Sequence, residues 1–290
     1  MTEGNVIVCG IDLGPSSEEV IAYAALFASS SGVPVRLLYV IDYLLTPPSY
    51  LAAYIDEEKK KEEAEMVRWK ERLVESGINA ESRIMMGRLH ESFSSVLSEA
   101  PVELLVIGYK SHLFRPSSSE RLIMSQRVPM LVVRPKSGDA PKIGAVKIRR
   151  IVCPVDFSEN SRKAASMAQQ YSATFSAELD LVHVIPSHLI KKKWMVWSDM
   201  DASDRDRFDE LMVSEAAATM SSFCRGLGIE KTGEITHGNP GEAIPALSAA
   251  RDTDLIVIGA RGLSYLQSML IGSTTEQVLK SSVCPVLIVH

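Results

Sequence analysis

The residues best suited to chemistry in this chain form a glycine pattern near its C-terminal end. Gly259 and Gly262 directly follow an apolar run, and Gly272-Ser273 opens a helix-like segment, which gives the spacing G-x2-G-x9-G-[ST]. Glycine allows a close approach between backbone and ligand because it has no side chain. The amide groups and positive dipole end of a helix N-terminus attract anions. The pattern therefore predicts a site that holds a phosphate group.

Asp156 is expected to lie beside this pattern. It ends the first apolar run of the second half, and parallel sheets bind ligands outside the carboxyl ends of their strands. Its carboxylate could accept hydrogen bonds from a ribose hydroxyl or an adenine amino group. A helix cap or turn residue is the alternative role of Asp156. A plain N-cap is the alternative for Ser273, and the two roles are compatible.

The elements that must position these residues occur twice. Residues 6–41 match residues 151–185, and residues 128–134 match residues 284–290. Each copy is an apolar strand ending in Asp, a Ser-rich turn, an amphipathic helix and a second apolar strand. This is a duplication of about 140 residues rather than a short-period solenoid. A chain of 290 residues accordingly predicts two domains, each with its own core.

Short β-branched strands alternate with helical segments in both copies, which predicts an α/β fold with a parallel sheet covered on both faces. The expected domains are 1–136 and 148–290, joined by a linker at 137–147. The junction between the domains is rich in Pro, Gly and Lys. Strands are expected near 5–12, 34–41, 81–86, 103–109, 129–134, 149–156, 178–185, 231–236, 254–260 and 285–290. Helices are expected near 16–31, 56–76, 90–100, 118–127, 159–174, 204–227, 241–252 and 273–282.

Composition excludes several classes of function. A net charge of −5 argues against a nucleic-acid partner. No apolar run reaches the 18 residues or so of a membrane span, and the N-terminus lacks the features of a signal peptide, so a cytoplasmic protein is expected. Buried, reduced thiols are favoured over zinc or redox chemistry because the cysteines share no C-x-x-C spacing. They are Cys9, Cys153, Cys224 and Cys284.

Both copies resemble universal stress protein domains of the UspA type, and the resemblance covers nearly the whole chain except the linker and residues 186–203. It implies two tandem Rossmann-like domains, each a five-stranded parallel sheet with helices on both faces. The ATP-binding branch of that family carries the same glycine motif, which is complete only in the second copy. The resemblance therefore implies a stress-response regulatory protein that binds ATP, or AMP, ADP or a cyclic nucleotide, with Mg²⁺ assisting at the phosphates.

The resemblance also extends the candidate site. An aspartate contacts the nucleoside in the family, a proline commonly precedes it by two residues, and adenine packs against the end of the second strand. Arg261 lies between the glycines and either reaches phosphate or is solvated. The candidate nucleotide-binding residues are Pro154, Asp156, Val184, Ile258, Gly259, Arg261, Gly262, Gly272, Ser273 and Thr274.

The first copy is expected to be degenerate. It keeps Asp12 and Gly108 but has Ser111 in place of the second glycine and Pro116 in place of the third. Proline has no N–H to offer a phosphate. One nucleotide per chain is the resulting expectation, with Asp12 serving as a strand-end or capping residue.

Three classes of function remain open at this point. The first is a regulatory ATP-binding module, favoured because no Walker lysine, kinase motif or paired acid and base is present. The second is a slow ATPase or phosphotransferase, and the third is a nucleotide-free interaction module. No catalytic residue and no metal ligand is assigned. His183 and His237 are expected to be structural, because no second ligand stands at a suitable spacing.

Two expectations concern assembly and a loop. Apolar last strands are expected at the sheet edges, so the two domains are expected to pair through residues 128–134 and 284–290, with a homodimer as a further step. The segment 186–203 is long for a connection between strand and helix. It holds Trp194 and Trp197 and forms either a nucleotide lid, a solvated loop or a surface for another subunit.

Overall fold

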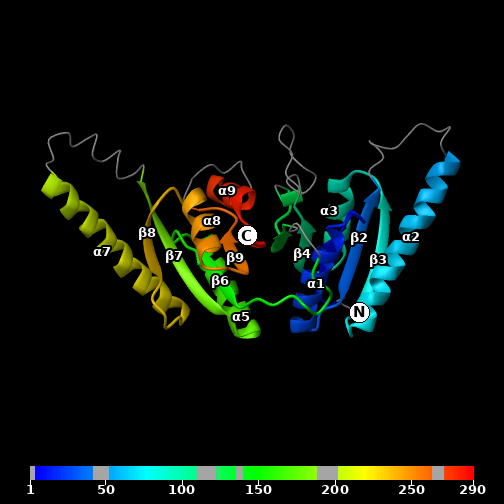
Figure 1. Ribbon diagram of the computed structural model, residues 1–290, viewed down its shortest axis with the longest axis horizontal. Helices are drawn as coiled ribbons and strands as arrows, with labels where there is room; N and C mark the ends of the chain where they lie inside the picture. The colour runs from blue at the N-terminus through cyan, green and yellow to red at the C-terminus, as the bar shows by residue number, and fades with distance from the viewer. Residues whose placement is uncertain are drawn as a thin grey trace. The chain divides into compact units, whose positions relative to one another are not determined.

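The computed structural model of the protein describes residues 4–41, 52–109, 122–123, 125–134, 140–187, 202–262 and 271–290. The chain forms two compact units, residues 1–147 and 148–290 (Figure 1).

The first unit contains one parallel sheet with the strand order β3-β2-β1-β4-β5. Adjacent strands β1 and β4 are separated in sequence by three helices, so the direction of strand addition reverses between them. The elements are β1 (Val6–Gly10), α1 (Ser17–Ser31), β2 (Val35–Ile41), α2 (Ala52–Glu75), β3 (Ala80–Met86), α3 (Leu89–Glu99), β4 (Val102–Gly108) and β5 (Met130–Val133).

The second unit repeats this arrangement with the order β8-β7-β6-β9-β10, again all parallel. Its switch in strand order lies between β6 and β9. The elements are β6 (Arg150–Pro154), α5 (Glu159–Phe175), β7 (Glu178–Pro186), α7 (Ala202–Leu227), β8 (Glu234–Gly238), α8 (Pro240–Ala250), β9 (Leu255–Gly259), α9 (Ser273–Ser281) and β10 (Val286–Val289). The predicted α/β fold is confirmed.

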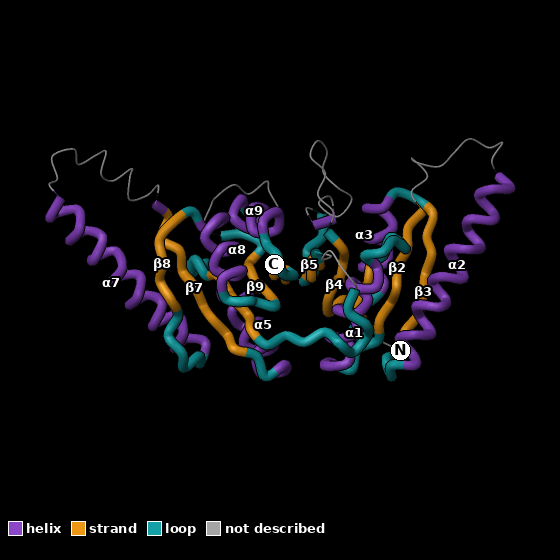
Figure 2. The backbone as a smooth tube through the Cα atoms, viewed as in Figure 1, coloured by secondary structure: helices purple, strands orange, loops and turns teal. Residues whose placement is uncertain are grey.

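Burial explains why the inner strands are uninterrupted apolar runs. Every residue of β1, β5, β9 and β10 is buried, because helices cover both faces of a parallel sheet. The outer strand β3 instead alternates between half-buried and exposed positions over most of its length. Strands and helices alternate along the tube in Figure 2, and the long helices α2 and α7 run beside the outer strands β3 and β8.

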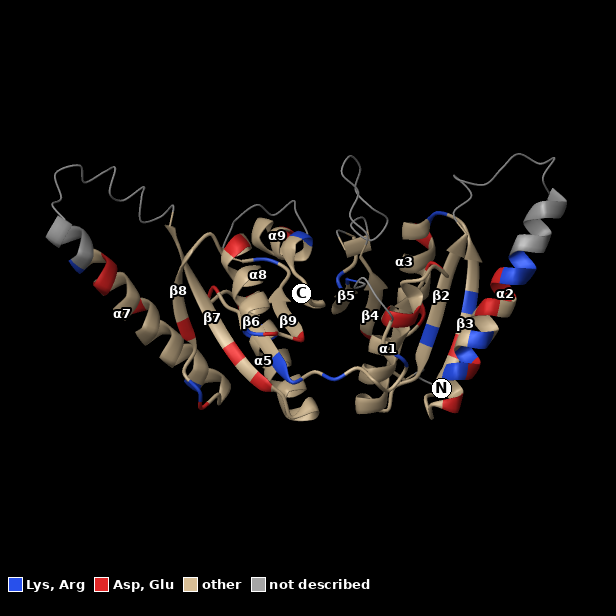
Figure 3. Cartoon of the chain, viewed as in Figure 1, with Lys and Arg blue, Asp and Glu red and all other residues tan. Residues whose placement is uncertain are grey.

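The charged run at residues 56–65 lies on α2, as the sequence indicates. Acidic and basic residues follow one another closely along its described part (Figure 3). Lys59 and Glu63 form an ion pair there, with 3.9 Å between Nζ and Oε1. The same helix also buries two apolar side chains, those of Met66 and Leu73, against the sheet. The predicted helix at 118–127 falls largely outside the described residues.

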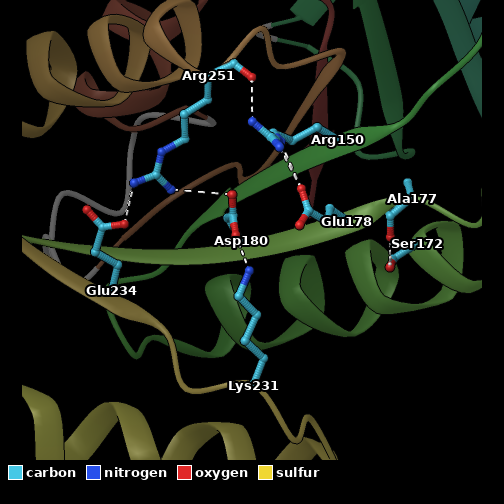
Figure 4. A network of polar contacts seen from close by, with 8 residues as sticks. All are labelled: Arg150, Ser172, Ala177, Glu178, Asp180, Lys231, Glu234 and Arg251. Atoms are coloured by element: carbon cyan, nitrogen blue, oxygen red, sulfur yellow. Dashed lines mark hydrogen bonds and ion pairs between the residues drawn. The ribbon is translucent and has the colours of Figure 1, made fainter.

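An ion-pair network joins the amino-terminal ends of β6, β7 and β8 (Figure 4). Asp180 on β7 accepts from Lys231 at 2.5 Å and from Arg251, the C-cap of α8, at 3.3 Å. Arg251 also pairs with Glu234 on β8. Burial raises the pKa of Asp180, but the hydrogen bond from Lys231 and the charges of Lys231, Arg251 and Arg150 outweigh it and hold that pKa below its usual value.

The first unit has a network at the same place with the signs reversed. Arg36 on β2 pairs with Glu81 on β3 and with Glu99 at the end of α3, which also pairs with Arg83. Val8 is the register partner of Arg36, as Val152 is of Asp180, and these valines match in the duplication. An arginine therefore stands in one unit where an aspartate stands in the other.

Candidate nucleotide site

Asp156 lies two residues after the end of β6, at the carboxyl end of the sheet's switch point. Its Oδ1 accepts from the Ser158 backbone N–H at 3.1 Å and from the Ser158 hydroxyl at 2.6 Å. Ser158 is in turn the N-cap of α5, where its side chain accepts from the Ser161 N–H. Asp156 is therefore a turn residue that also sits at the positive end of a helix, while the cap itself is Ser158.

Gly262 is the residue that meets Asp156 from the opposite side. A Cβ added at Gly262 would overlap Asp156 Oδ2, the carboxylate oxygen that Ser158 does not use. Gly262 is not among the described glycines with positive φ. The glycine is thus required by close approach rather than by a left-handed backbone, and the structure brings the loop after β9 onto the turn after β6.

Gly259 needs to be glycine for a different reason. A Cβ there would lie 2.9 Å from the backbone carbonyl carbon of Asn160, in the first turn of α5. The buried hydroxyl of Thr275 in α9 donates to the Gly259 carbonyl at 2.9 Å. The end of β9 is therefore held between the first turns of two helices.

The N-terminus of α9 is built on Gly272, which occupies the N-cap position at φ −78° and ψ 154°. The Gly272 N–H donates to the Ala260 carbonyl at 2.8 Å, and no side chain caps the helix. Ser273, the first helical residue, is exposed, and Thr274 is half-buried. The amides of the first helical turn have no partner within a helix, so this end can receive an anion.

Pro154 marks the clearest backbone difference between the two switch points. The ladder from β1 to β4 continues to Gly10↔Ile107, whereas that from β6 to β9 ends at Val152↔Ile256. The backbone N–H of Val155 donates to β7 at 2.8 Å, and that of Ile11 donates to β2. Because successive amides along a strand point to opposite sides, the backbone nitrogen of the preceding residue faces β9 in the second unit and β4 in the first. Proline has no N–H to give there. The residue that matches Gly10 thus removes a bond across the second switch point.

The remaining predicted residues are less directly connected to this loop. Val184 and Ile258 have only 6% and 5% of their surface exposed, so their side chains belong to the core at the ends of β7 and β9. Arg261 is half-buried, and its Cα lies 3.5 Å from the place of a Cβ on Gly272. Contacts of Val184, Ile258 and Arg261 with a ligand stay predictions.

Comparison with known proteins decides the family. The model of the universal stress protein family matches residues 5–134 and residues 147–290. The chain belongs to the universal stress protein family. A universal stress protein of Methanocaldococcus jannaschii is 30% identical over 156 residues, which cover 50% of this chain and 96% of that protein. The YxiE universal stress protein of Bacillus subtilis is 26% identical over 157 residues, 49% of this chain and 98% of that one.

A solved structure spans both units. The crystal structure of a universal stress protein from Archaeoglobus fulgidus has a TM-score of 0.70 and 21% identity, and the match covers 98% of this chain and 96% of that one. At this identity the likeness establishes the fold. The tandem arrangement predicted from the duplication is therefore confirmed.

The first unit of this universal stress protein keeps part of the same turn. Asp12 Oδ1 accepts from the Gly14 N–H at 3.0 Å and from the Ser17 hydroxyl at 3.1 Å. Ser111 and Pro116, on which the degenerate-copy prediction rests, lie outside the described residues, as do Trp194 and Trp197.

Two further findings concern metal-binding clusters and membrane-spanning helices. Within the described ranges, no cluster of three His, Cys, Asp or Glu side chains could hold a metal ion. No described helix is both long enough and apolar enough to cross a membrane. All four cysteines are buried and free, as the sequence predicts.

Sequence reasoning missed three residues that shape the site: Ser158, Asn160 and Thr275. A serine just before a helix is a recognisable cap signal, so Ser158 could have been assigned. Asn160 and Thr275 matter only through contacts with Gly259 on another element. No local pattern points to contacts of that kind.

Proposed function

We propose that this universal stress protein binds an adenine nucleotide, with ATP as the leading candidate, in its second unit. The observation that carries the proposal is the convergence of two helix N-termini on Gly262. The α5 end reaches Gly262 through Asp156, and the α9 end through Gly272, whose would-be Cβ lies 3.7 Å from the Gly262 nitrogen. Two positive dipole ends at one exposed glycine favour a bound anion.

The carboxylate of Asp156 lies on the nucleoside side of this arrangement. A carboxylate repels phosphate but accepts hydrogen bonds from a ribose hydroxyl or an exocyclic amine. The site thus offers an acceptor at the turn after β6 and amide donors at the start of α9. A nucleotide carries both kinds of complementary group, whereas inorganic phosphate carries one.

Mg²⁺ fits this site only as a companion of the nucleotide. Magnesium commonly keeps several waters and is held by one or two carboxylates together with substrate phosphates. No cluster of three ligands occurs among the described residues, so the nucleotide phosphates and waters would supply most of the ion's coordination. The role assigned to Mg²⁺ is charge neutralisation between the phosphates.

The proposal is tested by denaturing the purified protein mildly and identifying any released nucleotide by mass spectrometry. Titration calorimetry of the emptied protein with ATP, ADP, AMP and cyclic AMP, and with GTP for comparison, in the presence of Mg²⁺ then ranks the ligands. Binding of an adenine nucleotide in preference to GTP supports the proposal. Absence of binding by all four adenine nucleotides would falsify it and favour a nucleotide-free interaction module.

A slow hydrolase is the second candidate function. Ser273 is exposed and directly follows the N-cap Gly272 at the start of α9, the helix end at which the phosphate is proposed to bind. Single-turnover hydrolysis measured on the wild type and on Ser273→Ala distinguishes the two functions. A binding module gives negligible hydrolysis in both, while a hydrolase loses activity in the variant.

Pairing of the two units through β5 and β10, and assembly into a homodimer, complete the proposal. Both strands are wholly apolar, and an uncovered apolar edge strand is prone to aggregation. An experimental structure in which both strands face solvent would contradict the pairing.

A further inference from the structure

His183, near the end of β7, contacts both residues that flank Asp156. Its Nδ1 lies 2.8 Å from the carbonyl oxygen of Val155. Its ring stacks on that of Phe157, with 4.5 Å between the centroids and 28° between the planes. A carbonyl oxygen only accepts, so Nδ1 is the donor. One imidazole therefore holds the chain immediately before and immediately after the aspartate.

Phe157 has a backbone conformation that requires such support. Its φ is 66°, in the left-handed region that a large side chain rarely adopts. His183 covers one side of the ring, and Phe223 of α7 meets it edge-on with 5.7 Å between centroids. Arg162 of α5 lies over Phe223 at 4.9 Å. The surrounding elements thus fix a turn that its own backbone energy disfavours.

The left-handed residue sets the direction in which the chain turns after Asp156. Ser158 follows it and donates twice to Asp156 Oδ1, which orients Oδ2 toward Gly262. The contacts therefore run without a gap from His183 through Phe157 and Ser158 to the carboxylate. A change at His183 is expected to alter the carboxylate without touching a ligand.

The contacts of His183 with Val155 and Phe157 form a clamp on the turn. The first unit has the turn without this clamp. Leu13 matches Phe157 and is also left-handed, with φ 56°, and Asp12 makes the same bond to the amide two residues on. Tyr39 matches His183, and its hydroxyl donates to Glu62 on α2 at 2.7 Å. The turn belongs to the fold of both units, while the stacked imidazole belongs to the unit that carries Gly262.

We propose that His183 is a positioning residue for the nucleotide, acting through Asp156. This inference rests on the proposed function and goes beyond it, since the imidazole is assigned no contact with the ligand. Two variants remove the two contacts of His183 one at a time. His183→Phe keeps a stacked ring and loses the hydrogen bond. Phe157→Leu loses the stack and introduces the residue that the first unit has at this position.

The test is a double-mutant cycle with Mg-ATP as the calorimetric probe. His183→Phe and Phe157→Leu are each expected to weaken binding about tenfold, the effect of one lost hydrogen bond or stacking contact. In an Asp156→Ala background, neither is expected to weaken it further, because the residue through which they act is gone. Equal losses in both backgrounds would show a merely structural role and overturn the proposal. His237→Phe, an exposed histidine on β8, is the matched control and leaves affinity unchanged.

A second measurement is independent of ligand binding. The Ser158 amide donates to Asp156, and the Gly14 amide makes the matching bond to Asp12. Hydrogen exchange at Ser158 is expected to accelerate in His183→Phe, with exchange at Gly14 unchanged. If the wild type binds no adenine nucleotide, the proposed function is wrong, yet exchange at Ser158 still decides whether His183 holds Asp156. Unchanged exchange at Ser158 overturns the inference.

Discussion

Arg36 and Asp180 occupy the same position in the two units and carry opposite charges. Each is mostly buried, with 12% and 14% of its side chain exposed, and each pairs with two partners of opposite sign. The charge at the end of the neighbouring helix has changed with it, from Glu99, the last residue of α3, to Arg251, the C-cap of α8. What the fold requires at this place is a neutralised pair rather than a particular residue.

Asp180 is expected to make the second unit sensitive to acid. Because its folded pKa is lowered, its contribution to stability is present above the unfolded pKa of about 3.9 and is lost as the pH falls through the lower folded value. Asp180→Asn is expected to cost about 1–3 kcal/mol at pH 7, through the bonds to Lys231 and Arg251, and less at pH 3.

Urea unfolding at both pH values measures this difference. Asp252→Asn is the matched control, because Asp252 is exposed and asparagine tolerates its φ of 50°. A penalty for Asp180→Asn that is the same at pH 3 and pH 7 would contradict the assigned pKa direction.

Gly262→Ala is expected to weaken nucleotide binding by about tenfold or more, because the new methyl group displaces the Asp156 carboxylate. Calorimetry with Mg-ATP measures the effect. Gly4→Ala serves as the control, since a Cβ there meets nothing within 4 Å. Wild-type affinity in Gly262→Ala would remove Gly262 from the site.

Nucleotide stoichiometry is expected to be one per chain. The first unit keeps the turn at Asp12, but its β1–β4 ladder continues across the switch point to Gly10. Calorimetric titration gives the number directly, and an Asp12→Ala variant is expected to bind as the wild type does. Two comparable sites per chain would show that the first unit binds as well.

Turnover is expected to be far slower than the enzyme median of about 10 per second. Neither the sequence motifs nor the described residues provide an assigned general base for the exposed Ser273, and proton transfer to a positioned base is a large part of fast hydrolysis. Steady-state release of phosphate from ATP is the measurement. A rate near that median would identify the protein as a catalyst.

The four thiols are expected to resist labelling in the native protein. Cys9 and Cys153 are fully buried at matching positions of β1 and β6, and burial raises the pKa of both thiols. Thiolate is the reactive form, so reaction requires local or global unfolding. Ellman's reagent is expected to modify them at the rate of unfolding, and rapid modification at neutral pH contradicts this.

The sequence predicted the repeating elements well because their signals are local. Apolar β-branched runs, Ser-rich turns and the glycine pattern each lie within a short segment, and the strands appear within a few residues of their expected bounds. Strand β8 differs most: it was expected at 231–236 and is observed at Glu234–Gly238. Its short, half-exposed pattern carries a weak periodic signal.

The site was predicted as a set of residues but not as a set of contacts. The partner of Gly262 is a carboxylate in the turn after another strand, and the left-handed φ of Phe157 belongs to a residue type that gives no sign of it. The stacked rings belong to Phe157 and His183, which are 26 positions apart in the sequence. Such features depend on the packed sheet and cannot be read from neighbours in sequence.

The duplicated turn gives the molecule an internal reference. Gly14 and Ser158 report the same backbone bond, one in a unit without the clamp and one in a unit with it. Any change in temperature, salt or pH acts on both turns in the same sample. A signal at Ser158 that lacks a counterpart at Gly14 can therefore be attributed to the ligand site, without a second protein for comparison.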